Sequence, residues 1–148
     1  MHVEHIPFKD LNGNERTMDA YFHLRESDVV RMQMDEVGGL DERLKSLMEK
    51  QDVPAIMKFF EDFIGMAYGE KDPDGIHFNQ SEEISRRFKQ TEAYSNLYMK
   101  LCFDADAAAN FVNKVMPANL KETLEGYIEK AQKRQEQNVV PNTTPTAN

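Results

Sequence analysis

The sequence lacks most of the features that build disulfides, metal clusters and membrane spans. Its 148 residues include one cysteine, Cys102, which excludes an internal disulfide and a thiolate metal cluster. No apolar run approaches the ~20 residues that cross a bilayer. The N-terminus, MHVEHIPFKD, has neither the basic start nor the apolar segment of a signal peptide. We therefore expect a soluble, cytosolic protein.

Basic charge is also scarce. The chain carries 18 Lys and Arg against 26 Asp and Glu, a net charge of −8, and the acidic residues are spread along it. Attraction to nucleic acid or to an anionic membrane needs a concentrated basic face. We expect neither as a partner.

Recognisable catalytic motifs are missing as well. The sequence has no G-x-S-x-G nucleophile motif and no glycine-rich phosphate loop, and its four histidines show no H-x-x-x-H pairing. We therefore expect no catalytic residue, no cofactor site and no metal site, and we interpret the chain as a protein other than an enzyme. A hydrolase that uses a pair of carboxylates without a recognisable sequence motif remains an alternative, because acidic residues are plentiful.

The first 24 residues have the pattern of a β-hairpin. In TMDAYFHL, residues 17–24, apolar and polar side chains alternate, as they do in a half-buried strand. The stretch HIPF is a weaker strand, and Asn12-Gly13 between the two is a strong hairpin turn signal.

From Ser27, a candidate N-cap, the spacing becomes helical, and it continues to a last predicted helix from about Asn119. The sequence predicts a mainly α fold of the α+β class, with a hairpin over 1–24 and a compact bundle of about six helices over 25–135. Residues 1–135 form one domain in this interpretation. Residues 136–148, rich in Pro, Thr and Asn, are expected to be a flexible, disordered tail.

One predicted helix is apolar over most of its circumference. It begins after Asp52, a plausible N-cap, with Pro54 near its start. Its main stripe is Ile56, Phe60, Phe63, Ile64 and Ala67, while Met57, Phe59 and Met66 lie beside or opposite that stripe. Such a helix is either the centre of the fold or offers a second face to a partner.

The stretch EKDPDGIHFNQS, residues 70–81, begins like a calcium loop, with acidic residues at alternate positions followed by Gly75. The twelfth position, which should be a bidentate Glu, is Ser81, and Pro73 lies within the tight part of the loop. We interpret the segment as a Pro-Asp-Gly turn between two helices. A calcium-binding regulator that uses this loop remains the alternative.

Soft and aromatic apolar residues are abundant, with nine Met, nine Phe and five Tyr. Methionine lets a groove accept varied helical partners, so a binding module is favoured over an enzyme. The candidate partner-binding residues are Phe59, Phe63, Met66, Tyr94 and Tyr98, with a core role for all five as the alternative.

Three stretches together resemble the tail assembly chaperones of long-tailed, siphovirus-like bacteriophages. They are YFHLRESDVVRM at 21–32, FEDFIGMAYGEKDPDGIHFNQS at 60–81 and FKQTEAYSNLYMKLCFDADAAANFVNKVMP at 88–117. The features that match are an acidic helix after an aromatic strand end, an A-Y-G-E-K turn, a T-x-A-Y helix and an Asp/Ala-rich helix that ends in Pro.

The resemblance implies a protein that binds the tape measure protein and keeps it soluble during tail morphogenesis. It also implies self-association, possible contact with the tail tube protein, and action in the host cytoplasm with absence from the mature virion. A small acidic structural or interaction protein of the phage tail is the alternative to this function.

Overall fold

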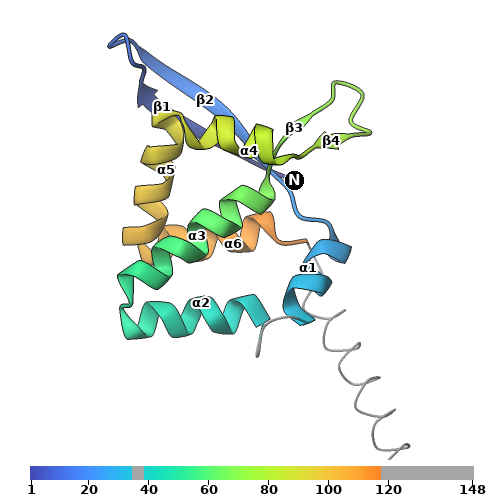
Figure 1. Cartoon of the computed structure of the whole chain (residues 1–148), viewed down its shortest axis with the longest axis vertical. Helices are drawn as coiled ribbons and strands as arrows, with labels where there is room; N and C mark the ends of the chain where they lie inside the picture. Colours follow the sequence, from blue (N-terminus) through green and yellow to red (C-terminus); the bar gives the residue numbers. More distant parts are fainter. Residues whose placement is uncertain (35–38, 118–148) are drawn as a thin grey trace, which may run out of the picture. The chain divides into compact units, whose positions relative to one another are not determined.

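The computed structural model describes residues 1–34 and 39–117. Two paired strands come first, six helices follow, and two short strands interrupt the helices (Figure 1). The elements are β1 (His2–Lys9), β2 (Glu15–Phe22), α1 (Glu26–Met34), α2 (Gly39–Lys50), α3 (Val53–Ala67), β3 (Tyr68–Lys71), β4 (Phe78–Asn79), α4 (Glu82–Lys89), α5 (Glu92–Phe103) and α6 (Ala105–Val115). The predicted fold class, a hairpin followed by a helical part, is confirmed. The predicted helix from Asn119, the domain end at residue 135 and the tail over 136–148 lie outside the described residues.

The N-terminal hairpin forms as the sequence predicts. Strands β1 and β2 pair in antiparallel register from His2 opposite Phe22 to Lys9 opposite Glu15. In the turn Gly13 has a φ of 86°, a value that glycine adopts without strain. The Asp10 carboxylate accepts hydrogen bonds from the backbone N–H of Asn12 and of Asn14, both at 2.9 Å, and these bonds lower the Asp10 pKa below its ordinary value.

The segment over residues 70–81 is a turn, but the turn does not join two helices directly. Helix α3 ends at Ala67, and the chain continues as β3, which pairs with the end of β2 and then with β4. Gly75, with a φ of 74°, forms the bend between β3 and β4. Gly69 is required in β3, because a Cβ there would lie 2.6 Å from the Phe78 ring. The sheet therefore has four strands in the order β1-β2-β3-β4.

Side-chain caps fix where most helices begin. Asp52, Ser81, Thr91 and Asp104 each accept a hydrogen bond from the backbone N–H three residues later. The proposed Ser27 cap is wrong, because α1 begins at Glu26 and Ser27 lies inside it. There the Asp28 carboxylate accepts from the backbone N–H of Arg25 at 3.2 Å, which satisfies this end of the helix instead.

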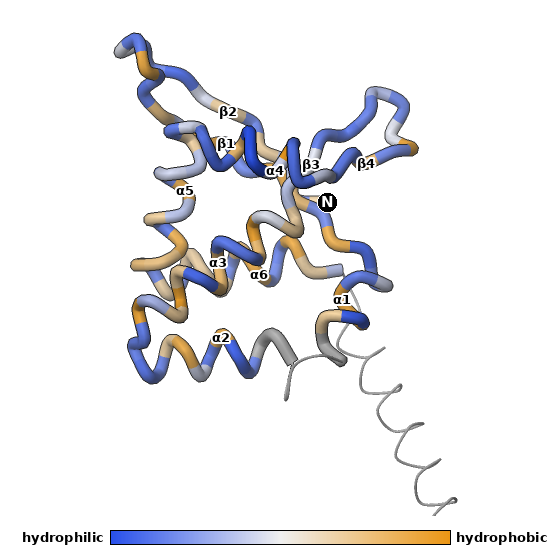
Figure 2. The backbone as a smooth tube through the Cα atoms, in the orientation of Figure 1, coloured by the Kyte–Doolittle hydropathy of each residue, from blue (hydrophilic) through white to orange (hydrophobic). Residues whose placement is uncertain are grey.

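The core forms around α3. Helices α2, α4 and α5 all pack against α3, and α5 also packs against β1 and α6 (Figure 1). Phe60 and Phe63 of α3 are buried, and the Phe63 ring meets that of Phe111 from α6 at a centroid distance of 6.0 Å. Phe111 in turn contacts Phe22 of β2 at 5.0 Å. Hydrophobic residues recur along α3 and α6, whereas α4 is mostly hydrophilic (Figure 2).

Candidate functional site

An open groove runs along α3 in the described part of the chain. It has a volume of about 840 Å³ and lies between α3, the α1 and α2 helices, and α4 with the segment before it. Its lining residues are Met32, Arg43, Phe59, Asp62, Phe63, Gly65, Met66, Gln80, Ser81, Glu82, Ser85, Arg86 and Lys89. The groove therefore contains three of the five candidate partner-binding residues.

The floor of the groove is apolar. The rings of Phe59 and Phe63 stack at a centroid distance of 5.9 Å and an interplanar angle of 9°. Only 5% of Phe59 and 1% of Phe63 is exposed, so these rings close the bottom of the groove and belong mainly to the core. Met66 is 44% exposed and, together with Met32, offers flexible apolar contact surface.

Side chains of α4 lie close to the α3 backbone at Gly65. A Cβ at this position would lie 3.1 Å from Lys89 Nζ and 3.3 Å from Ser85 Oγ. The bare helix backbone at Gly65 therefore faces the ends of two α4 side chains on the inside of the groove.

The rim is charged with both signs and is exposed. Lys58 pairs with Asp62 at 3.3 Å, Arg86 pairs with Glu83, and Lys89 Nζ lies 4.0 Å from Glu61. Such exposed pairs contribute little to stability. Their charges instead surround the apolar floor with polar groups, as at the border of protein interfaces.

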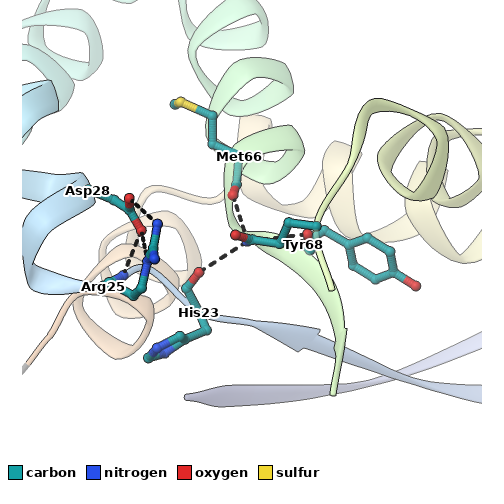
Figure 3. A network of polar contacts seen from close by, with 6 residues as sticks. His23, Arg25, Asp28, Met66 and Tyr68 are labelled. Atoms are coloured by element: carbon teal, nitrogen blue, oxygen red, sulfur yellow. Dashed lines mark hydrogen bonds and ion pairs between the residues drawn. The ribbon is translucent and has the colours of Figure 1, made fainter. Parts of the chain in front are cut away.

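A hydrogen-bonding network fixes one end of the groove (Figure 3). The Gln80 side-chain Nε2 donates to the Met66 carbonyl at 2.9 Å, and it lies 3.4 Å from the His23 carbonyl and 3.5 Å from that of Tyr68. Gln80 thereby ties the last turn of α3 to the ends of β2 and β3. The backbone that carries Met66 is held in place, while the Met66 side chain remains exposed.

The other two candidate residues, Tyr94 and Tyr98, do not line the groove. They stack on each other at 5.3 Å along α5, and the Tyr98 hydroxyl donates to the Met57 carbonyl of α3 at 2.9 Å. Burial raises the pKa of both phenols above the ordinary value. Of the five candidates, Met66 is the one with a largely exposed side chain.

Sequence reasoning missed the residues that α4 and the segment before it contribute, from Gln80 to Lys89. The sequence singles out Ser81 only as the twelfth position of the calcium-like stretch, and the pattern of EEISRRFK, residues 82–89, is that of an ordinary solvated helix. Nothing in its spacing shows that it packs beside α3. The glycine at position 65 was the available signal, since glycine inside a helix often marks a close approach.

Three side chains at the bend of the second hairpin lie close together. Ligand atoms of Asp72, Asp74 and His77 are all within 4.8 Å of one another. The Asp72 carboxylate already accepts from Asn79 at 2.7 Å, and that of Asp74 accepts from the Ile76 N–H at 2.9 Å, as in an Asx turn. The flanking segments are strands, so the helix–loop–helix frame of a calcium loop is not formed here.

Among the described residues, none of the helices combines the length and the hydrophobicity that crossing a bilayer requires.

Comparison with known proteins identifies the family. No curated protein and no solved structure matches the chain significantly. A sequence family described as phage tail assembly chaperone matches residues 1–147, which is almost the whole chain and includes every element of the groove. The description names an assembly chaperone and agrees with the resemblance carried by the three stretches of sequence. The chain belongs to the phage tail assembly chaperone family.

Proposed function

We propose that this protein binds the tape measure protein during tail morphogenesis and keeps it soluble, with a helix of that protein lying in the groove along α3. The observation that carries the proposal is the combination of an apolar floor, an exposed methionine and a charged rim in the groove along α3. An amphipathic helix binds such grooves through side chains spaced three and four residues apart.

Several properties of the groove suit a long helical client. Met32 and Met66 can adjust their side chains to different apolar residues, so successive segments of one client can occupy the same site. Charges of both signs at the rim, including Asp62 and Lys89, can pair with the polar flanks of an amphipathic helix. A net charge of −8 keeps the complex soluble once the apolar stripe of the client is covered.

Where the protein acts forms part of the same proposal. We expect it in the host cytoplasm and absent from the mature virion, with self-association and contact with the tail tube protein as further interactions. These expectations separate a chaperone from a small structural protein of the tail, which would remain in purified particles.

Co-expression with the tape measure protein tests the proposal, and Met66→Glu is the informative variant. Met66 is exposed, so glutamate leaves the fold intact but puts a charge where a client side chain would have to desolvate it, which is unfavourable by several kcal/mol. We expect the soluble fraction of the tape measure protein to fall severalfold. Phe59 is unsuitable for such a test, because at 5% exposure a charge there would disrupt the core.

Ile76→Glu is the matched control. Ile76 is 75% exposed at the bend of the second hairpin, outside the groove, and receives the same charge. We expect this variant to rescue the tape measure protein as well as the parent does, with both variants showing the parent's circular dichroism. Undiminished rescue by a folded Met66→Glu protein would remove the groove as the binding site.

A further inference from the structure

Among the residues that the structure describes, one edge of strand β2 is unpaired along most of its length. It pairs with β1 over eight residues, but with β3 only at Tyr21 and Phe22. Beyond Gly69, β3 turns to pair with β4 instead. Within the described part of the chain, residues 15–20 of β2 consequently have a sheet neighbour on one side only.

The hydrogen-bond pattern shows which backbone groups point to that edge. Asp10 N–H donates to the Asn14 carbonyl at 2.8 Å, so pairs of even-numbered residues exchange the bonds between β1 and β2. The odd-numbered residues of β2 point away from β1, as the pairing of Tyr21 with Gly69 confirms. Among the described residues, the backbone N–H and carbonyl groups of Glu15, Thr17 and Asp19 therefore have no hydrogen-bond partner.

The opposite edge of the sheet is protected. Pro7 of β1 has no N–H, and its carbonyl accepts a hydrogen bond from Asn96 of α5 at 3.2 Å. Helix α5 packs alongside β1. Proline and a covering helix are the usual means by which proteins block an edge strand. In residues 1–34 and 39–117, neither a proline nor a packed helix protects the edge of β2, and the side chains of Glu15, Thr17 and Asp19 are exposed there.

We propose that this edge binds an extended segment of another protein as an added strand, with basic residues opposite Glu15 and Asp19. Glu15, Thr17 and Asp19 lie on one face of β2, and a strand that continues the line of β3 would place its own alternate residues beside them. Asp19 Oδ1 contacts His5 Nδ1 at 2.6 Å, which leaves its second oxygen for the incoming strand. On the other face, Met18 is half-buried and favours an apolar partner residue.

The same charges argue against a second copy of this chain as the occupant. Antiparallel pairing of two β2 edges centred on Thr17 brings Glu15 of each copy opposite Asp19 of the other. Like charges directly opposite each other are destabilising. A shift by two residues in one direction places Arg16 of one copy opposite Arg16 of the other. A shift in the other direction places Glu15 opposite Tyr21, which already pairs with β3.

The test is a titration of the ¹⁵N-labelled protein with a synthetic peptide, acetyl-Thr-Lys-Val-Thr-Glu-Lys-Thr-amide. Its two lysines would lie opposite Asp19 and Glu15, and its valine opposite Met18. We expect saturable shifts of the Glu15, Thr17 and Asp19 amide signals below ~1 mM peptide, a weak but specific affinity. The Arg16, Met18 and Ala20 amides already bond to β1, so they should move less. A peptide with glutamate in place of both lysines should bind at least tenfold more weakly.

Three substitutions make the outcome decisive. Glu15→Lys should weaken binding of the basic peptide at least threefold, and binding should recover when the peptide lysine opposite position 15 is changed to glutamate. Thr17→Pro removes an N–H from the open edge without removing a bond to β1, and should abolish binding. Val3→Pro does the same at the protected edge and should leave binding unchanged.

Three results would overturn the proposal. One is the absence of saturable shifts, and another is equal binding of the basic and acidic peptides. The third is slow hydrogen exchange of the Glu15, Thr17 and Asp19 amides in the peptide-free protein, since it would mean that the edge is already paired.

Discussion

Truncation of Phe111 to alanine should destabilise the protein strongly, because this residue joins three parts of the fold. Phe111 is 2% exposed, and its ring contacts Phe22 at 5.0 Å, Phe63 at 6.0 Å and His2 at 6.1 Å. Removing a buried phenylalanine costs ~3–5 kcal/mol. Each aromatic ring pair that is lost adds ~0.5–1.5 kcal/mol to the cost of losing the buried surface. We expect a loss near the upper end of the 3–5 kcal/mol range.

Phe103→Ala is the control for this prediction. Phe103 is 61% exposed at the end of α5, so the same truncation should change the free energy of unfolding by less than ~0.5 kcal/mol. Urea unfolding followed by circular dichroism measures both variants. Since total stability is ~5–15 kcal/mol, the Phe111→Ala midpoint should fall far below that of the parent. Equal midpoints for the two variants would refute the packing described here.

Three further outcomes are expected. Gly69→Ala should lower the melting temperature, because its Cβ would lie 2.8 Å from the Asn79 carbonyl and such overpacking costs ~1–3 kcal/mol. The control Gly65→Ala meets only flexible side-chain ends and should be nearly neutral, and a larger loss of stability in Gly65→Ala than in Gly69→Ala would be inconsistent with the close approach of β4. Burial lowers the His23 pKa below 6.5, so the folded state disfavours the charged imidazole, and the free energy of unfolding should fall as the pH drops from 7 to 5. His23→Gln should weaken this pH dependence of stability. An unchanged pH dependence in the variant would exclude His23 as the cause. Mass spectrometry of purified phage particles should not detect the protein, and its presence in stoichiometric amounts would favour a structural role.

Local sequence signals predicted much of the fold. The alternation over residues 17–24 and the Asn12-Gly13 pair predicted the hairpin, because side-chain period and turn chemistry are local properties. The cap at Asp52 was predictable for the same reason, since a cap needs only one side chain near the helix start.

The second hairpin could not be predicted in the same way. Strand β3 has four residues and pairs with each neighbour over only two of them, so no periodicity develops. Its formation depends on the end of β2, almost fifty residues earlier in the sequence, and on Gly69 admitting the Phe78 ring. Such long-range requirements leave no local signature.

The groove was predictable only in part. Met66 lies off the main stripe of its helix, which correctly suggested an exposed position. Phe59 also lies off that stripe, yet it is buried, because helices α2, α4 and α5 surround α3 on several sides. Which face of an all-round apolar helix remains open depends on the surrounding helices, and the sequence of that helix does not specify it.

Photocrosslinking from position 66 would show whether the tape measure protein lies in the groove along α3. A photoreactive phenylalanine analogue would replace Met66 in one protein and Ile76 in another, each co-expressed with the tape measure protein and irradiated. We expect crosslinks from position 66 to tape measure segments with apolar residues three and four apart, and few from position 76. Crosslinks of equal yield from both positions, or from position 76 alone, would contradict this prediction.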